Sequence, residues 1–276
     1  MVSTVPAEAL VPVLRQEPVA AAEAAPLAPR ARLLPSLAAV YRAQLSRARV
    51  ARMPLLFVAT FQSVGIMIMM RGVVDGGDGE AARAVVAGSS VLVVAFVALN
   101  LLAQYFGSLR ASGGLDTYAT LPVPPASVVL GAAAAYASFT VPGAVVTAVA
   151  GSALFGLPLA HLWVLAAVIP LAGAALAGLG AALGLLAPRQ ELATLFGQMG
   201  MSAALLLGVL PASNLPAPIQ WLRDLLPSTY GVEAFARSFD ASPDWVAVLA
   251  DLSVCAGVGV ASLAVATWAY RRAATR

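Results

Sequence analysis

Few side chains in this sequence could carry out covalent, metal or nucleotide chemistry. The chain has one His, one Cys and sixteen basic residues, all of which are Arg. The phosphate-binding loop of an ATPase needs a Lys to reach the β- and γ-phosphates of ATP, so this sequence cannot form an ordinary one. Cys255 has no partner for an internal disulfide, and His161 has no Cys or second His beside it. We therefore predict no catalytic residue, no metal site and no cofactor bound by the chain itself.

Polar residues within apolar segments are the other candidates for function, because ionisable groups inside a membrane usually have a role. Asn100, Gln104 and Asp251 lie within or near such segments. Asp251 could pair with Arg223 or Arg237. We favour a structural ion pair over a proton relay, because one acid alone makes a poor relay.

The composition indicates what must hold these residues in place. Hydrophobic residues make up 61% of the chain, charged residues make up 11%, and the mean hydropathy is +0.88. A soluble domain has roughly 45–50% apolar and about 25% charged residues, so this chain has too few polar side chains to cover a water-facing surface. In lipid the backbone must be hydrogen-bonded internally, as in helices or closed barrels. The apolar runs are long and unbroken, whereas barrel strands are short and alternating, so we predict an all-α membrane protein.

The first part of the chain is expected to lie outside the hydrocarbon core. Residues 1–32 are rich in Ala, Pro and Glu without apolar periodicity, which indicates a disordered cytoplasmic tail. After them, Leu37 and Tyr41 belong to one apolar helical face, while Arg42 and Arg49 lie on the remaining faces or at the end. A basic amphipathic helix before a span predicts an elbow helix in the headgroup layer. A cytosolic helix packed on a soluble partner is the alternative.

Residues 33–276 are predicted to form one membrane domain with six transmembrane helices. A helical span needs about 20 residues, within a range of roughly 17–25. The third and fourth apolar runs are longer, so they would tilt or extend past the bilayer. The six runs cover residues 53–71, 84–106, 127–155, 159–187, 192–211 and 245–270.

Small residues are concentrated in the fourth run, at spacings that let helices approach closely. We expect them to pack against other helices of the same chain rather than to form a dimer seam. These residues are Gly173, Ala177, Gly180, Ala181 and Gly184.

The distribution of Arg predicts the orientation. With the amino terminus inside the cell, twelve of the sixteen Arg residues fall on cytoplasmic segments and four on outer ones. The positive-inside rule therefore predicts a multi-pass protein of the plasma membrane with both termini in the cytoplasm. The basic pI near 9.4 follows from this topology, so nucleic acid is not an expected partner.

The outer segment before the last run, residues 212–244, is too long for a simple turn. It carries two apolar helical patterns separated by Pro227. Glu233 and Arg237 are spaced i,i+4 in the second pattern and are expected to pair. We predict short re-entrant helices that dip into the outer leaflet; a folded extracellular cap is the alternative.

Two segments resemble parts of a known family. The inside loop contains Gly114-Leu115-Asp116 and then Thr120-Leu121-Pro122-Val123, and the outer segment contains Leu226-Pro227-Ser228-Thr229-Tyr230 followed by Glu233-Ala234-Phe235-Ala236-Arg237. In this order and placement they resemble the first cytoplasmic loop of ABC-2 type permeases and the segment before the last span of that family. Daunorubicin-resistance-like drug permeases look most similar. The family often has a Glu just before the glycine-containing turn, where this chain has Arg110, Ala111 and Ser112.

The resemblance implies the membrane subunit of an ABC exporter that moves a drug, antibiotic or lipid out of the cell. A separate ABC ATPase subunit would use ATP and Mg²⁺. The family likeness also implies a dimer, a homodimer or a heterodimer, sealed mainly by the first and fifth spans. The residues expected at this seam or along the pathway are Gln62, Met67, Gln198 and Met201.

Two other classes of function are open. A secondary transporter or channel would work without an ATPase, but it predicts polar groups converging near mid-membrane, and the sequence offers few. A membrane enzyme would need paired carboxylates, His or Cys near a membrane face, and the chain has one His and one Cys.

A permease without a nucleotide site must receive work through a rigid cytoplasmic protrusion. Asp is a capping residue and Pro122 ends a helix, so residues 116–121 are predicted to form a short helix there. Leu115, Tyr118 and Leu121 recur at steps of three, and we expect this face to bind a groove on the ATPase. The alternative is that they pack against the chain's own elbow helix. The predicted coupling site comprises Arg110, Gly114, Leu115, Asp116, Tyr118, Leu121 and Pro122.

Overall fold

The computed structural model describes residues 31–47, 52–72, 79–209, 220, 223–224, 226–240 and 242–274. Within these residues the secondary structure consists of helices and turns, and no strand occurs. The prediction of an all-α chain is confirmed for this part of the sequence. Residues 1–30 of the predicted tail and Arg49 of the predicted elbow helix lie outside the described residues.

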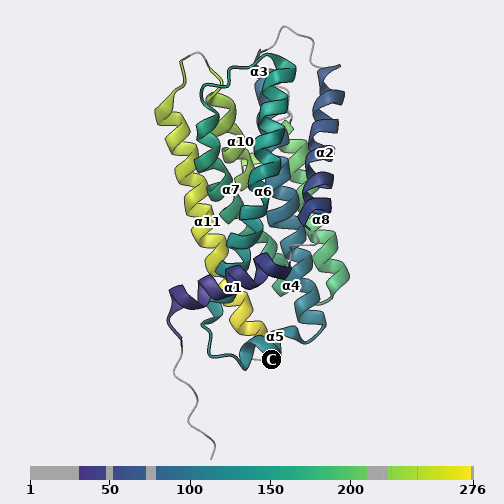
Figure 1. Ribbon diagram of the computed structural model, residues 1–276, viewed down its shortest axis with the longest axis vertical. Helices are drawn as coiled ribbons and strands as arrows, with labels where there is room; N and C mark the ends of the chain where they lie inside the picture. Colours follow the sequence, from purple (N-terminus) through teal and green to yellow (C-terminus); the bar gives the residue numbers. More distant parts are fainter. Residues whose placement is uncertain are drawn as a thin grey trace, which may run out of the picture. The chain divides into compact units, whose positions relative to one another are not determined.

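The long helices run side by side, and a shorter one crosses them (Figure 1). Long apolar segments fold as continuous helices because a helix satisfies the backbone hydrogen bonds within the segment itself. The elements are α1 (Leu33–Arg47), α2 (Arg52–Arg71), α3 (Gly79–Val94), the π-helix η2 (Ala95–Leu101), α4 (Leu102–Ala111), α5 (Gly114–Ala119), α6 (Pro125–Phe155), the 3₁₀-helix η3 (Leu162–Val164), α7 (Leu165–Leu186), α8 (Gln190–Val209), α10 (Pro227–Arg237) and α11 (Trp245–Ala274).

Four helical segments of the described chain are long and apolar enough to cross a membrane. They are Gly79–Ala111, Pro125–Phe155, Leu162–Leu186 and Trp245–Ala274, and they coincide with the second, third, fourth and sixth predicted spans. The first and fifth predicted spans fall on α2 and α8, which are helices of 20 residues each. The total of six spans therefore stays a prediction.

Local sequence signals explain where α6 begins and ends. Pro125 occupies the first turn, where its missing N–H costs no hydrogen bond. Gly156 follows the last turn with a φ of 69°, a left-handed conformation that glycine adopts without strain. Between these ends Pro142 is accommodated inside the helix, so α6 spans 31 residues without interruption.

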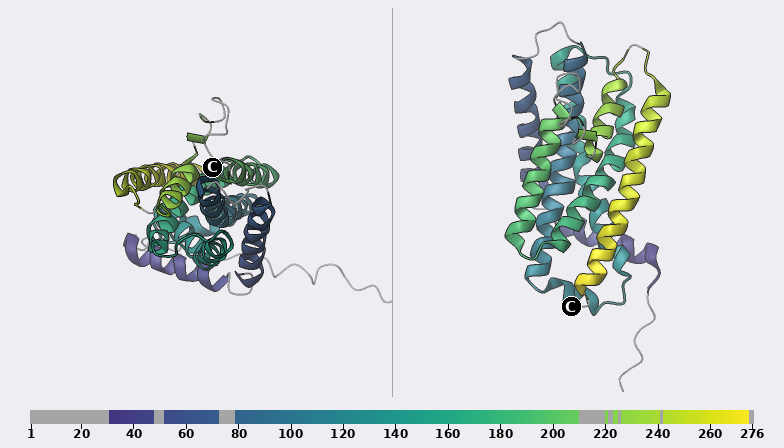
Figure 2. Two further views of the ribbon diagram at one scale, coloured as in Figure 1. Left: turned by 90° about the horizontal axis from the view of Figure 1, so that it is seen from above. Right: turned by 180° about the vertical axis from the view of Figure 1, so that it is seen from behind.

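The predicted elbow segment does form a helix, α1, which lies across the long helices (Figures 1 and 2). It packs against α6. Its buried face is formed by Ser36, Val40 and Gln44, at steps of four, while Leu37 and Tyr41 are half-buried beside it. The apolar face predicted from the sequence is thus turned partly away from the bundle. The position of α1 in the headgroup layer stays a prediction.

The second span is the longest, with 33 residues, and it is interrupted by a π-helical segment. Asn100 lies in this segment and is buried, and its side-chain carbonyl accepts a hydrogen bond of 3.0 Å from Gln104. The Asn100 amide also faces the sulfur of Met201 in α8, at 4.0 Å. Segments of π-helix occur often at functional sites, because they change which residues face a neighbouring helix.

Helix α7 lies at the centre of the bundle and packs against α11, α6, α4 and η2. Its glycines allow the close approach. A Cβ at Gly180 would meet the Leu99 carbonyl oxygen, and one at Gly184 would meet that of Ala103. The small residues of the fourth span therefore pack within the chain, as predicted.

Gly180→Ala should destabilise the bundle, because the added methyl group would collide with backbone atoms of η2 that cannot move aside. We expect a loss of about 1–3 kcal/mol, measured as a lower melting temperature in detergent. Gly257 of α11 is the matched control, since it is exposed and has nothing within 4 Å of an added Cβ. Gly257→Ala should be neutral or stabilising, because Ala favours a helix over Gly by about 1 kcal/mol. Equal melting temperatures for the two variants would contradict the close packing of α7.

Candidate functional site

The predicted coupling loop lies at one end of the bundle, where α4 ends and α5 begins (Figure 1). Gly113 reverses the chain between them with a φ of 70°. The Ser112 N–H donates to the Ser108 carbonyl at 2.9 Å, and the Gly113 N–H donates to the Arg110 carbonyl at 3.3 Å. These bonds close the end of α4 and fix the direction in which α5 leaves it.

Arg110 fastens this turn to the centre of the bundle. Its guanidinium donates to the carbonyl oxygens of Leu185 and Ala187 at 2.8 and 2.7 Å. Both carbonyls lie at the end of α7, where a helix leaves acceptors unsatisfied and carries partial negative charge. Arg110 therefore holds α4 to α7 within the chain.

One face of α5 is turned inward. Leu115 is 4% exposed and belongs to the hydrophobic core, and the half-buried Tyr118 packs against that core. The packing partners of α5 are α4 and α11. Leu115 and Tyr118, which we expected on the surface with Leu121, instead anchor the helix to its own chain, because a helix of six residues needs an apolar face of its own to stay in place.

The opposite face of α5 is exposed. Asp116 and Thr117 lie on it, and Thr120, Leu121 and Pro122 are exposed in the turn that follows the helix, where Leu121 is 48% exposed. The helix begins at Gly114, two residues earlier than predicted, so Asp116 lies in the first turn rather than at the cap. A carboxylate in the first turn is favourable because it faces the positive end of the helix.

Tyr105 of α4 connects the neighbouring elements behind α5. The Gln44 side-chain amide of α1 donates to its hydroxyl at 2.5 Å. Tyr118 of α5 lies close to the same hydroxyl. The Tyr105 ring lies 5.8 Å from that of Tyr136 in α6. One side chain thus contacts the elbow helix, the coupling helix and a long span.

One further contact joins the residues before the elbow helix to the coupling loop, and another joins the elbow helix to α6. The Ala31 N–H donates to the Pro122 carbonyl at 3.0 Å, directly after α5. The hydroxyls of Tyr41 and Ser138 lie 3.1 Å apart between α1 and α6. The loop, α5 and α1 therefore form one connected end of the bundle.

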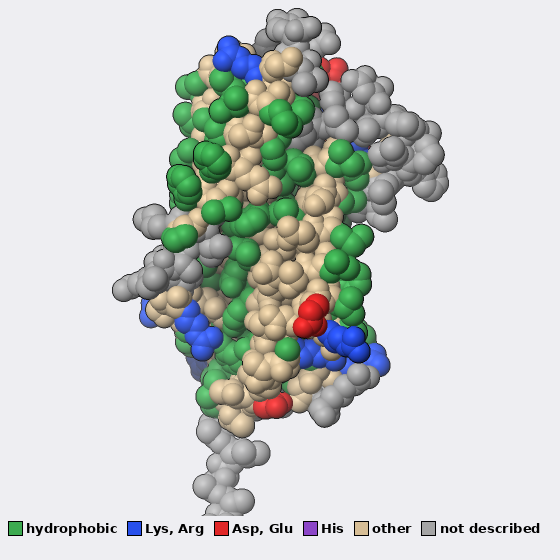
Figure 3. Space-filling model, turned by 90° about the vertical axis from the view of Figure 1, so that its right-hand side faces the viewer, with side chains coloured by type: hydrophobic (Ala, Val, Ile, Leu, Met, Phe, Trp, Pro, Cys, Tyr) green, Lys and Arg blue, Asp and Glu red, His purple; other side chains and the backbone are tan. Residues whose placement is uncertain are grey.

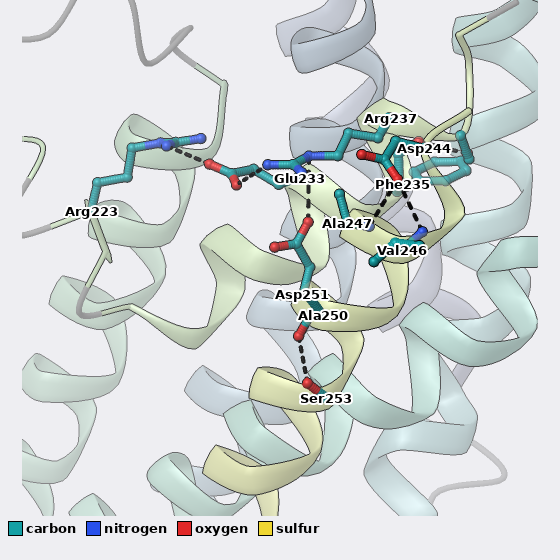
Figure 4. A network of polar contacts seen from close by, with 11 residues as sticks. Arg223, Glu233, Phe235, Arg237, Asp244, Val246, Ala247, Ala250, Asp251 and Ser253 are labelled. Carbon is teal, nitrogen blue, oxygen red and sulfur yellow. Dashed lines mark hydrogen bonds and ion pairs between the residues drawn. The ribbon is translucent and has the colours of Figure 1, made fainter. Parts of the chain in front are cut away.

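The other end of the bundle holds a network of ion pairs (Figure 4). Glu233 of α10 lies between two guanidinium groups, 2.6 Å from that of Arg223 and 3.2 Å from that of Arg237. Arg237 in turn lies 3.4 Å from Asp251 of α11. The predicted pair of Glu233 with Arg237 is confirmed, and of the two partners considered for Asp251 the structure has Arg237. A separate pair joins Arg83 of α3 to Asp240.

Hydrogen bonds complete this end. Asp244 accepts from the N–H groups of Val246 and Ala247 at 3.1 and 3.2 Å, which caps α11. The Tyr230 hydroxyl donates to the Asp224 carbonyl at 2.9 Å. Burial raises the pKa of Tyr230, and the nearby charge of Asp224 raises it further, so the phenol stays protonated and can donate.

A comparison with known protein families assigns this chain to one of them. The sequence matches the ABC-2 type transporter family over residues 37–239. The chain belongs to the ABC-2 type transporter family. The matched region contains most of α1, the coupling loop and α10, so both segments on which the resemblance rested lie inside it. No curated protein matches the chain.

Membership of the ABC-2 family makes the chain a membrane transport component, which is not itself catalytic. Among the described residues, no group of three or more His, Cys, Asp or Glu could hold a metal ion. The likeness to daunorubicin-resistance permeases stays a prediction.

Of the four residues predicted at the dimer seam on α2 and α8, the structure buries two and leaves two accessible. Met67 is completely buried and Met201 is 5% exposed, so both belong to the protein's own core. Gln62 is half-exposed and Gln198 is exposed. The face that carries α2 and α8 is hydrophobic over its middle and charged near its ends (Figure 3). Its exposed side chains include Phe57 and Phe61, whose rings stack 5.7 Å apart.

Sequence reasoning missed Gln44 and Tyr105. A signal for Gln44 was present, because Ser36, Val40 and Gln44 recur at steps of four, as one helix face does. The role of Tyr105 depends on three elements meeting at one point, and no spacing along the chain reveals that.

Glu233→Gln should loosen the network opposite α5. The substitution leaves the buried Arg223 without the carboxylate that compensates its charge. We expect a loss of about 1–3 kcal/mol in stability, seen as a lower melting temperature in detergent. The matched control is Glu191→Gln, which changes an exposed residue at the other end of the bundle. If both variants melt at the same temperature, the network does not stabilise the fold.

Proposed function

We propose that this chain is the permease subunit of an ATP-driven ABC exporter that moves a hydrophobic or amphipathic compound, such as a drug, an antibiotic or a lipid, out of the cell. Family membership supports the transport part of the proposal. The single observation that supports energy coupling is the exposed face of α5, which is held rigidly at the end of the bundle. ATP and Mg²⁺ are bound by a separate ATPase subunit, because this chain has no Lys with which to build a phosphate-binding loop.

The contact with the ATPase is proposed on the outward face of α5. Asp116, Thr117 and Leu121 present a carboxylate, a hydroxyl and an exposed apolar side chain at this face. Leu115 and Tyr118 keep α5 attached to the core, so a push on the outward face reaches α4 and α11. Arg110 passes the same displacement to α7 through its two hydrogen bonds.

Orientation in the plasma membrane follows from the charges at the α5 end. Arg110, Arg189, Arg271 and Arg272 belong to segments that meet there, and Arg-rich segments stay on the cytoplasmic side. We therefore place α5 and the carboxyl terminus in the cytoplasm, where an ATPase has access to ATP.

Two permease copies are proposed to form the working unit, as a homodimer or a heterodimer. The exposed aromatic and aliphatic side chains of α2 and α8 support this, because they form an apolar face that the described residues leave uncovered. Gln62 and Gln198 lie on these two helices and would face the seam or the pathway.

Leu121→Arg should weaken assembly with the ATPase while leaving the permease folded. Leu121 is exposed, so an Arg there meets water in the free subunit and a partner surface in the complex. We expect at least a tenfold loss of affinity, about 1.4 kcal/mol, in pull-down titrations with the ATPase. The mass of the wild-type complex should correspond to two permeases and two ATPases.

Two comparison variants sharpen this test. Leu159→Arg changes an exposed Leu at the other end of the bundle and should leave the affinity unchanged. Leu115→Arg should lower the melting temperature of the free permease, because it forces a charge into the core. Unchanged assembly and unchanged efflux in Leu121→Arg would overturn the proposed contact, and efflux that persists without the ATPase would favour a secondary transporter.

A further inference from the structure

A long apolar groove runs along the bundle between α6, α7 and α11. Its volume is about 780 Å³, within the range of roughly 300–1,000 Å³ that is usual for ligand sites. Small side chains form much of its wall, including the exposed Ala134 and Ala166. Trp163 lies at one end, and Leu37 of α1 lies at the other. The elbow helix therefore forms part of the groove.

A second groove, of about 450 Å³, continues the first toward the α5 end. Leu130 of α6 and Leu263 of α11 line both grooves. The second groove adds Thr267, Trp268 and Arg271, which supply a hydroxyl, an indole and a guanidinium. An apolar path thus leads to a polar, positively charged end.

The surroundings of the groove indicate that it faces the hydrocarbon core of the membrane. The three helices that form it are each apolar and long enough to cross a membrane. From Leu130 to Val145, α6 rises roughly 22 Å at 1.5 Å per residue, which exceeds half of a hydrocarbon core about 30 Å thick. An acyl chain from one leaflet fits this length, and it needs no hydrogen-bond partner from a wall of Ala, Val and Leu side chains.

The polar end of the groove complements a lipid headgroup. Trp is enriched at the level where acyl chains meet headgroups. Arg binds phosphate groups well, and basic residues at the membrane surface attract anionic lipids. Arg271 belongs to the last turn of α11, beside Arg272, which lies over the Trp268 ring at 5.5 Å. Charge and position therefore match an anionic headgroup.

We infer that this groove binds one anionic phospholipid. Its phosphate lies at Arg271, and an acyl chain runs along α6 from Leu130 past Ala134. The site is separate from the proposed transport seam, because α2 and α8 lie on the side of the bundle away from α11 (Figures 1 and 2). A bound lipid would stabilise the contact between α1 and α6, since Leu37 and Ser138 both line the groove.

The test uses the full chain in detergent, without an ATPase, so its result does not depend on the proposed function. Dioleoyl phosphatidylglycerol and dioleoyl phosphatidylcholine are titrated separately, and binding is followed by native mass spectrometry and melting temperature. One phosphatidylglycerol should bind per chain, more tightly than phosphatidylcholine. Arg271→Gln should reduce phosphatidylglycerol affinity roughly fivefold to tenfold. Arg189→Gln, the same change at an exposed residue outside the groove, should have no effect.

A second pair of variants tests the groove itself. Ala134→Trp and Ala166→Trp fill the groove and should abolish binding of both lipids. Ala261→Trp places the same bulk on an exposed position of α11 that does not line either groove, and binding should persist. The inference is overturned if both filled variants still bind phosphatidylglycerol, if Arg271→Gln behaves as Arg189→Gln does, or if the wild type binds both lipids equally.

Discussion

A helical bundle dissolved in lipid places its charged contacts near its two ends, because an ion inside the hydrocarbon is costly. The interior of this chain obeys that constraint, because its long helices satisfy their own backbone and pack through Ala, Gly, Val and Leu. In the proposed mechanism, work from the ATPase enters at one end of the bundle, through the surface of α5. Arg110 supplies the fixed point, since its two hydrogen bonds to the end of α7 hold the turn before α5 to the centre of the bundle.

The two ends are built differently, and one span joins them. The α5 end is closed by hydrogen bonds of Arg110 and Tyr105, whereas the opposite end is closed by ion pairs around Glu233 and Arg237. The segment Gly79–Ala111 has 33 residues and is roughly 50 Å long at 1.5 Å per residue. It carries Arg83 near one end and Arg110 near the other. Its π-helical segment lies between them, against the glycines of α7 and α8. In the proposed mechanism, a displacement at α5 reaches the opposite end of the bundle through this single span, whose π-helical part lies against the glycines of α7 and α8.

Much of the fold could be predicted from the sequence. Hydropathy located the long helices, and composition excluded a soluble protein. The i,i+4 spacing predicted the pair of Glu233 and Arg237, and the spacing of small residues predicted the packing of α7. These features depend on local periodicity or on one partner nearby in the chain, which a sequence shows directly.

The misplaced residues have a common physical cause. Periodicity predicts that Leu115, Tyr118 and Leu121 share a helical face, but it does not show whether the core or a partner covers that face. In the structure the helix has six residues and ends before Leu121, so Leu115 and Tyr118 pack on the core while Leu121 is exposed. Met67 was expected at a seam, yet it fills the space beside Gly151 and Val86, which only the folded bundle creates. Tyr105 acquires its role because α1, α5 and α6 meet there. Contacts between elements distant in the sequence decided each of these positions.

We propose that an ATPase pushes on the outward face of α5. It is tested by labelling Thr117→Cys with a polar maleimide on the protein in detergent, where both ends of the bundle are accessible and the natural Cys255 is buried. Ser242→Cys, at an exposed position before α11, serves as the reference. We expect the ATPase to slow labelling at position 117 and to leave labelling at position 242 unchanged. Equal labelling at position 117 with and without a bound ATPase would contradict it.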